Sequence, residues 1–360
     1  MFSNYRIYTC LLFLNCLAFG FACNPPHDEP EITYELIKTA TFPLHYAGEV
    51  HACDFRDGRG VIYNFKNTEL VLFDSSGNIL RRDTVASEGS NSLSYISGLK
   101  ILSDGNILVN TLSGEIAILN KDLQLEQKIS MPFPNGLANM RSNVKVMDIW
   151  KDELLIHYPG RGGKNPYMKG YFKENKLVEK VNLNTGEASP FLDLPPDSQY
   201  QEDLYFDLPH VFLSVYDQTL YFAFDKEPMI HLYNLKANGR YEKTIDIAAE
   251  KFVQLEGQPF PAGHSGSNAV PGTIDGLYPF DEGIAVNYRE GIDEETRGVY
   301  KNVLKIYHHS SGWSNELVLP RDEVSYLLNF ESPEKPFYAL QYDSFGHLHV
   351  VKFSLERKPK

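Results

Sequence analysis

The sequence predicts an all-β fold, a six-bladed β-propeller made of four-stranded antiparallel blades. The first observation is the stretch Val61–Val85, in which three short β-type runs are separated by two tight turns, Lys66–Thr68 and Asp74–Asn78. The second turn carries the Asp, Gly and Asn residues that reverse a strand. With the preceding run Val50–Phe55 the stretch forms a four-stranded meander. Such a small sheet cannot bury both of its faces alone, so it needs neighbours of its own kind.

The second observation is that this unit recurs. The second strand of each copy starts just after a turn, at Val61, Ile107, Leu154, Leu220, Ile284 and Phe337. These starts are 46, 47, 66, 64 and 53 residues apart, and a four-stranded propeller blade takes roughly 40–50 residues. Six copies with insertions fill the chain, which indicates six blades. The alternative is an all-β sandwich, or a pair of sandwiches, because the spacing becomes irregular after the third copy.

The third observation concerns helices and the closure of the ring. Outside the N-terminal segment, no run of about ten residues has the apolar period of a helix, so almost no helix is expected. The last copy, Tyr326–Phe353, has only three good strands, whereas the strand-like run Ile32–Leu44 has no partner nearby. We expect this run to close the ring as the outer strand of the last blade. Pro43 is tolerated on such an edge, and closure leaves no unpaired edge.

The N-terminus predicts export. Arg6 precedes the apolar run Ile7–Ala22, which is followed by a polar stretch rich in proline. The run is too short to span a bilayer, so residues 1–22 are predicted to be a secretory signal peptide. Ala22-Cys23 resembles a bacterial lipobox, in which the cysteine becomes the lipidated first residue of the mature protein. Gly20 and Phe21 depart from the usual pattern, and the alternative is ordinary cleavage near Ala22, which leaves a soluble exported protein.

The rest of the chain is expected to form a short linker and one domain. Residues 23–31 form a proline-rich, acidic linker, and residues 32–360 form a single propeller. An acylated Cys23 would tether the protein to a membrane. We therefore expect the protein to lie in the cell envelope, on the outer membrane. The sequence does not distinguish the outer surface of this membrane from its periplasmic side. Cys53 would then have no disulfide partner and is predicted to be a buried free thiol.

Composition excludes one class of partner. The net charge is −13 and the isoelectric point is about 5.3, and no basic stripe is present, so nucleic acid is not an expected partner. Aromatic residues make up 13% of the chain, which suits packing between blades.

Four long insertions predict the functional face. Two, Tyr158–Glu174 and Arg289–Tyr300, join the second and third strands of a blade, and two, Leu194–Pro209 and Glu250–Gly272, join one blade to the next. In a propeller both kinds of connection leave the same face of the disc, and binding residues concentrate on loops held by a rigid scaffold. We expect an unidentified glycan, peptide or protein to bind this face.

The candidate binding residues are tyrosines, cations, carboxylates and histidines, which suit stacking and bidentate hydrogen bonds. They are Tyr158, Arg161, Lys164, Tyr167, Asp203, Tyr205, His210, His264, Arg289 and Arg297. The alternative is that these loops are simply solvated and that their aromatic residues pack on the rim.

No catalytic pattern stands out, so the sequence favours a binding module over an enzyme. The alternative is a metal-dependent hydrolase or lyase with its site in the central channel of the propeller. Its candidate ligands near inner strands are Glu49, Asp148, Asp207, His210, Asp275 and Asn287, and their spacing is not diagnostic. A nucleophile elbow is missing, and no cofactor is expected.

A family resemblance supports this interpretation. The lipobox-like Ala22-Cys23, the acidic linker and repeated units such as Leu70–Gly77 and Ile118–Asp122 resemble uncharacterised bacterial envelope lipoproteins with a six-bladed propeller, domain-of-unknown-function family 4221. The resemblance spans about Ile32 to the end. The resemblance implies a six-bladed propeller fold and a location in the cell envelope, and it implies no activity.

Overall fold

The computed structural model describes residues 32–85, 92–93, 95–111, 114–131, 145–159, 163–261, 270–292, 301–320 and 324–359. The predicted signal peptide, the lipidation site Cys23 and the linker lie outside these residues, as do Arg161, His264 and Arg297.

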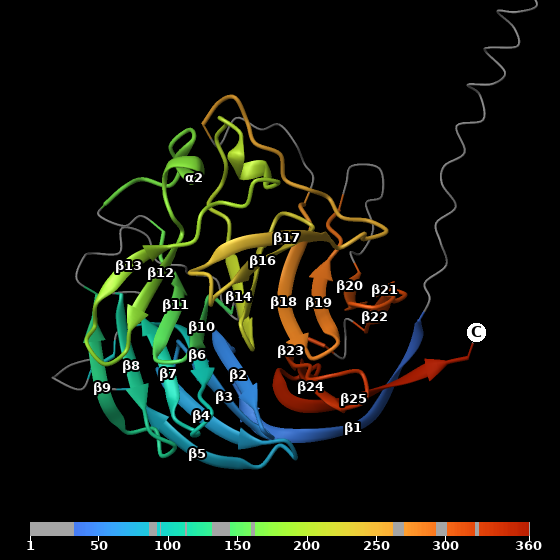
Figure 1. The fold of residues 1–360 in the computed structure, drawn as a ribbon. Coiled ribbons are helices and arrows are strands. Elements are labelled where there is room, and N and C mark those ends of the chain that lie inside the picture. The colour runs from blue at the N-terminus through green and yellow to red at the C-terminus, as the bar shows by residue number, and fades with distance from the viewer. Residues whose placement is uncertain are drawn as a thin grey trace, which may run out of the picture.

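Six antiparallel sheets stand around one axis, which confirms the predicted six-bladed propeller (Figure 1). Blade 1 is formed by β2 (Ala52–Arg56), β3 (Arg59–Asn64), β4 (Glu69–Asp74) and β5 (Ile79–Thr84). Blade 2 is formed by β6 (Ile96–Ile101), β7 (Ile107–Thr111), β8 (Glu115–Leu119) and β9 (Leu125–Ser130). Blade 3 is formed by β10 (Met147–Trp150), β11 (Glu153–His157), β12 (Val178–Asn182) and β13 (Ala188–Phe191). Blade 4 is formed by β14 (Val211–Tyr216), β15 (Thr219–Phe224), β16 (Met229–Asn234) and β17 (Arg240–Asp246).

The last two blades depart slightly from this plan. Blade 5 contains β18 (Thr273–Phe280), β19 (Gly283–Arg289) and β20 (Asn302–His308), and its outer strand is split into β21 (Gly312–Trp313) and β22 (Leu317–Leu319). Blade 6 contains β23 (Tyr326–Asn329), β24 (Phe337–Tyr342), β25 (His347–Lys358) and β1 (Thr33–Ala47). The second strands of all six blades begin within two residues of their predicted starts.

The N-terminal strand closes the ring as predicted. β1 pairs antiparallel with β25, from Thr33 opposite Lys358 to Ala47 opposite His347, and so forms the outer strand of blade 6. Asn315 ties this strand to blade 5, because its side chain accepts a 2.7 Å hydrogen bond from the Tyr34 amide and donates a 3.0 Å bond to the Tyr34 carbonyl. Closure therefore involves side chains as well as the strand pair.

Short polar residues end the third strand of several blades. The Asp74 Oδ1 atom accepts hydrogen bonds from the amides of Ser76 and Asn78, each 2.9 Å long, which reverses the chain toward β5. Asn120 makes the same pair of bonds in blade 2. In blade 3 the reversing residue is Asn182, whose Oδ1 atom accepts 2.9 Å hydrogen bonds from the amides of Asn184 and Thr185. This local chemistry is what made the repeat visible in the sequence.

The core is divided among the blade boundaries. Six clusters of buried apolar side chains are found in the described part of the chain, and each joins two neighbouring blades. Between blades 6 and 1, for example, the ring centroids of Tyr338 and Phe55 lie 5.0 Å apart. Cys53 is a free thiol, and burial raises its pKa to about 12, so it is an unreactive part of this packing.

Helix is nearly absent from the described chain, as expected. The two short pieces are α2 (Tyr171–Glu174) and the 3-10 turn η1 (Gln199–Gln201), and both lie in long connections rather than in blades. Within the described ranges, no helix is both long enough and apolar enough to cross a membrane.

Candidate functional site

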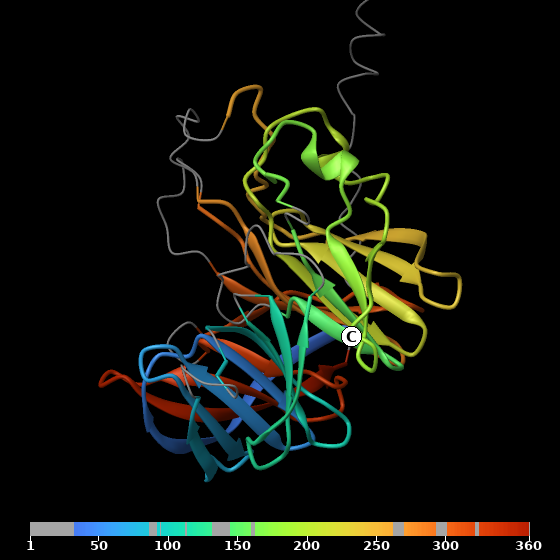
Figure 2. The ribbon, with the colours of Figure 1, turned by 90° about the vertical axis from the view of Figure 1, so that its left-hand side faces the viewer.

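The four long connections form one layer on one face of the disc. They run between β11 and β12, β13 and β14, β17 and β18, and β19 and β20, so the strand order places all four on the predicted face. We call their described residues, 158–159, 163–177, 192–210, 247–261, 270–272, 290–292 and 301, the long-loop layer. Figures 1 and 2 show its green, yellow and orange segments standing clear of the strands around α2.

Backbone hydrogen bonds join these connections to one another. Tyr205 and Gln258, from two different connections, exchange a pair of backbone bonds of 2.8 Å each. The Val253 amide donates a 2.8 Å bond to the carbonyl of Glu290 in the connection of blade 5. The segments are therefore held as a single surface rather than as separate loops.

Aromatic rings fix the layer to blade 4. The ring centroid of Tyr200 lies 5.1 Å from that of Phe172, 4.7 Å from that of Phe206 and 4.4 Å from that of Phe224 on β15. Contacts of this kind contribute beyond the burial of their area. They give the loops a small core of their own.

A buried polar pair anchors the same connection. Glu227 and His231 both have a side-chain exposure of 0%, and Glu227 Oε2 lies 3.3 Å from His231 Nε2. The Glu227 carboxylate also accepts hydrogen bonds from the Gln199 amide (2.7 Å) and the Ser198 hydroxyl (3.1 Å). Because buried carboxylates are retained only where they are well partnered, this pair holds η1 in place.

Three of the predicted binding residues lie exposed on the layer. Lys164 Nζ donates a 2.6 Å hydrogen bond to Asn175, and Asp203 forms a 3.0 Å ion pair with Lys169. Tyr167 is also exposed. These side chains can contact a partner at the surface of the protein.

The other described candidates are less accessible. Tyr158 is 1% exposed, and burial raises the pKa of its hydroxyl to about 12. Arg289 is held by Asp275 through two hydrogen bonds of 2.5 and 2.8 Å. Tyr205 and His210 are half-buried, and the His210 amide donates a 2.9 Å bond to Asp225. The layer thus brings some of these residues to the surface and uses others to support it.

Exposed apolar side chains on this face were missed by sequence reasoning. Of nine large exposed apolar residues in the described chain, six lie on the long-loop layer or on the short turns that share its face. They are Phe65, Tyr167, Met168, Phe260, Val270 and Phe345. Phe260 is 64% exposed and lies between Pro259 and Pro261, a sequence signal that it cannot join a regular element. Contiguous exposed apolar groups mark interaction surfaces, and on the long-loop layer Tyr167 and Met168 are adjacent in the chain.

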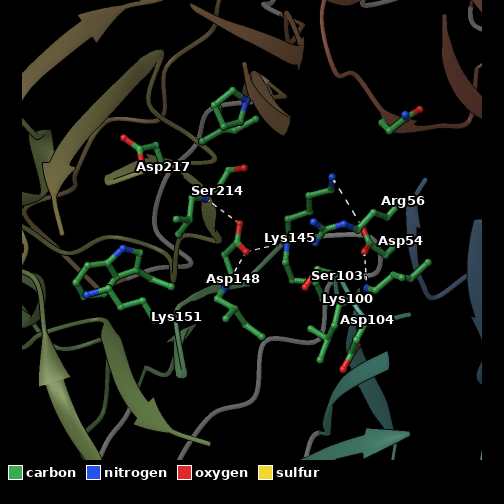
Figure 3. Close-up of a pocket in the computed structure, with 18 of the residues that line it drawn as sticks. Asp54, Arg56, Lys100, Ser103, Asp104, Lys145, Asp148, Lys151, Ser214 and Asp217 are labelled. Carbon is green, nitrogen blue, oxygen red and sulfur yellow. Dashed lines mark hydrogen bonds and ion pairs between the residues drawn. The ribbon is translucent and has the colours of Figure 1, made fainter. Parts of the chain in front are cut away.

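The opposite face opens into the central channel. A cavity of about 1150 Å³ lies there, lined mainly by the inner strands of the blades and their first turns, and also by parts of the outer strands and turns of blades 2 to 4 (Figure 3). Its two buried acidic groups are fixed by neighbouring blades: Asp54 on β2 accepts a 2.7 Å hydrogen bond from the Ile101 amide of blade 2. Asp148 on β10 accepts a 2.8 Å bond from the Val215 amide of blade 4.

Two lysines balance these carboxylates. Lys100 Nζ lies 2.9 Å from Asp148, and Lys145 Nζ lies 4.0 Å from Asp54. Burial lowers the pKa of both ammonium groups, but for Lys100 the attraction of Asp148 and Asp54 outweighs burial and raises the pKa. For Lys145 burial prevails and the pKa is lowered. Of these two lysines, Lys100 is well paired and Lys145 is weakly paired.

The proposed metal ligands do not converge. In the described residues, no group of three or more His, Cys, Asp or Glu side chains is arranged to hold a metal ion. Asp148 and Asp275 are engaged by Lys100 and Arg289. Glu49 pairs with Lys66 at 2.6 Å, and the Asn287 side chain donates to Asn302. Asp207 is exposed and His210 is half-buried in the long-loop layer.

Comparison with known proteins supports the fold. No family model matches the chain, and no curated protein matches it. Among solved structures, a member of the DUF4221 family from Bacteroides vulgatus has a TM-score of 0.64 at 12% identity, covering 91% of this chain and 99% of its own. A Bacteroides fragilis protein described as exported has a TM-score of 0.53 at 9% identity, covering 92% and 98%. The predicted resemblance to family 4221 is confirmed as a shared six-bladed propeller.

Proposed function

We propose that the protein is an envelope-tethered binding module whose long-loop layer docks a peptide segment or a protein surface. The observation that carries this proposal is that Tyr167, Met168 and Phe260 are exposed on the long-loop layer, where Lys164 and Asp203 are exposed as well. Interfaces combine apolar anchors with a polar rim in this way. A glycan remains a second ligand class, because Tyr167 could stack on a sugar ring.

Tethering rests on the N-terminal sequence. The signal peptide and the lipobox-like Ala22-Cys23 support export and acylation of Cys23. The described fold begins at Ile32, so nine residues, 23–31, would separate the lipid from the ring. A structural relative described as exported is consistent with this address.

Binding can be tested with peptide and glycan arrays probed by the protein without its signal peptide. A variant with Tyr167→Ser, Met168→Ser and Phe260→Ser removes three exposed side chains without altering the ring. The matched control is Leu80→Ser with Val318→Ser, on the outer strands β5 and β22. We expect the triple variant to lose at least about tenfold in affinity for the strongest peptide, because hot-spot truncations reach about 2 kcal/mol each. Equal affinity of the two variants would reject the layer as the docking face, and hits confined to glycans would reassign the ligand class.

A further inference from the structure

The channel cavity has a ligand-binding chemistry of its own, independent of the long-loop layer. It opens on the other side of the disc, where the strands are joined only by short turns. Figure 3 shows Asp54, Lys100, Lys145 and Asp148 near one another inside it. At about 1150 Å³ the cavity is slightly larger than a typical small-molecule site and has room for one.

Asp54 and Asp148, the two buried carboxylates of this cavity, are already partnered. Asp54 and Asp148 each accept a hydrogen bond from a backbone amide of a neighbouring blade. Asp148 also pairs with the Lys100 ammonium and accepts a 2.6 Å hydrogen bond from the Ile149 amide. They join the inner strands and leave little capacity for a cationic ligand. The buried part of the cavity, around these two carboxylates, therefore does not favour an amine ligand.

Lys145 is in the opposite situation. Its nearest carboxylate oxygen, on Asp54, is 4.0 Å away, beyond hydrogen-bond distance. Its ammonium lies 4.5 Å from the ring centroid of Tyr278, and none of its N–H groups has a hydrogen-bond acceptor among the residues that the structure describes. The side chain is 27% exposed and faces the cavity. Burial lowers the pKa of this ammonium, with Lys100 reinforcing that effect and Asp54 opposing it. An anion placed beside it would supply the missing acceptors and restore the charged form.

The surroundings limit the anion to a single charge. Five lysine or arginine side chains and six aspartate or glutamate side chains line the cavity, so its formal charge is close to zero and a polyphosphate would be repelled. Between the charges the walls include apolar side chains, such as Val215, Leu277 and Phe330, as well as neutral polar ones. One negative group on an apolar body matches both features.

We propose that the channel cavity binds a small organic carboxylate, whose oxygens accept hydrogen bonds from Lys145 and Lys100 and whose apolar body packs against Tyr278 and Leu277. The charge of Asp54 raises the pKa of both lysines, so both ammonium groups lie near this carboxylate and a ligand placed between them can contact both. Charge-assisted hydrogen bonds of this kind are the strong ones.

The test compares matched acids and amides. Fluorine NMR line broadening is measured for 4-(trifluoromethyl)benzoate and 4-(trifluoromethyl)phenylacetate, each beside its neutral primary amide. We expect the acids to bind and the amides to bind at least about tenfold more weakly. The variant Lys145→Met should lose binding of the acids by a similar factor and remain folded, because Asp54 keeps its bond to the Ile101 amide.

The control variant is Lys236→Met, which removes an exposed cation at the mouth of the same cavity. It should retain binding of the acids within about twofold, because an exposed charge contributes little. Equal binding of acids and amides would overturn the proposal. So would acid binding that survives Lys145→Met, or the absence of acid binding at concentrations on the order of 10 mM. Circular dichroism of both variants shows that any loss is not a loss of fold.

Discussion

The carboxylate of Asp148 on blade 3 accepts a 2.8 Å hydrogen bond from the amide of Val215 on blade 4. Asp148 is 6% exposed, and the same side chain holds the ammonium of Lys100 from blade 2 at 2.9 Å. One residue thus connects three blades at the axis of the ring. A buried group with several partners is costly to lose, because each partner is then left unsatisfied.

Asp148→Asn should therefore destabilise the protein by about 2–3 kcal/mol, since a neutral amide cannot both pair with Lys100 and accept two amides. The matched control is Asp217→Asn in an exposed turn of the same face, expected to change stability by less than about 0.5 kcal/mol. Urea unfolding monitored by tryptophan fluorescence measures both. Similar losses in the two variants would contradict the role given to Asp148.

The Glu227–His231 pair should control the mobility of the connection between β13 and β14. Glu227→Met removes the acceptors of the Gln199 amide and the Ser198 hydroxyl. Amide hydrogen exchange in residues 196–206 should then rise by roughly tenfold or more, because lost buried hydrogen bonds are worth about 1–3 kcal/mol. Exchange in β14 and β15 should change far less. The control variant Glu202→Met alters an exposed glutamate three residues from Gln199. An equal increase in hydrogen exchange in the control would contradict the anchoring role given to Glu227.

His157 predicts a pH dependence of stability. Burial, with a smaller contribution from the charge of His210, lowers its pKa to about 3 in the folded protein. In the unfolded chain His157 has the ordinary histidine pKa of about 6.5 and is protonated at a higher pH than in the folded protein. The free energy of unfolding that His157 contributes above about pH 6.5 is therefore lost as the pH falls toward about 3. Between about pH 7 and pH 5 the loss from this residue is about 2 kcal/mol.

The variant His157→Gln should remove that part of the pH dependence. The urea midpoint is measured at neutral and at mildly acidic pH for wild type and variant, and the change between the two pH values is compared. A loss of stability that is the same at both pH values does not affect this comparison. The exposed His45→Asn variant should keep the wild-type slope. An unchanged slope in His157→Gln would show that another group carries the proton uptake.

Chelation should leave the protein unaffected. The Asp148 and Asp275 carboxylates are engaged by Lys100 and Arg289, and the described residues offer no converging set of metal ligands. Prolonged treatment with a chelator should shift the melting temperature by less than about 1 °C, since a bound metal would add several kcal/mol by mass action. Stoichiometric calcium or zinc in purified protein, lost on His210→Ala, would instead favour the hydrolase alternative.

The fold could be predicted because its signals are local. Asp74 and Asn120 reverse the chain with their own side chains, so each blade marks its turns in the sequence. The closing strand was predictable because Ile32–Leu44 lacked a neighbour and the last blade lacked a strand. The one-sided distribution of long connections followed from strand order alone.

The details of the two faces could not be predicted, because they depend on contacts between distant blades. The sequence gives no sign that Tyr158 is buried while Tyr167, nine residues later, is exposed. Lys145 precedes the first strand of blade 3, and its position in the channel depends on Asp54 and Tyr278 from blades 1 and 5. Such a site appears only when the ring is assembled.

The most direct test of the docking face is to locate a bound ligand by hydrogen-exchange mass spectrometry. The strongest array ligand is added, and protection is measured for peptides across the described chain. We predict protection in residues 163–175, 196–210 and 250–261, and none in the short turns that surround the channel cavity. Protection confined to those turns, such as the ones after β6 and β14, would contradict the assignment of the long-loop layer as the binding face.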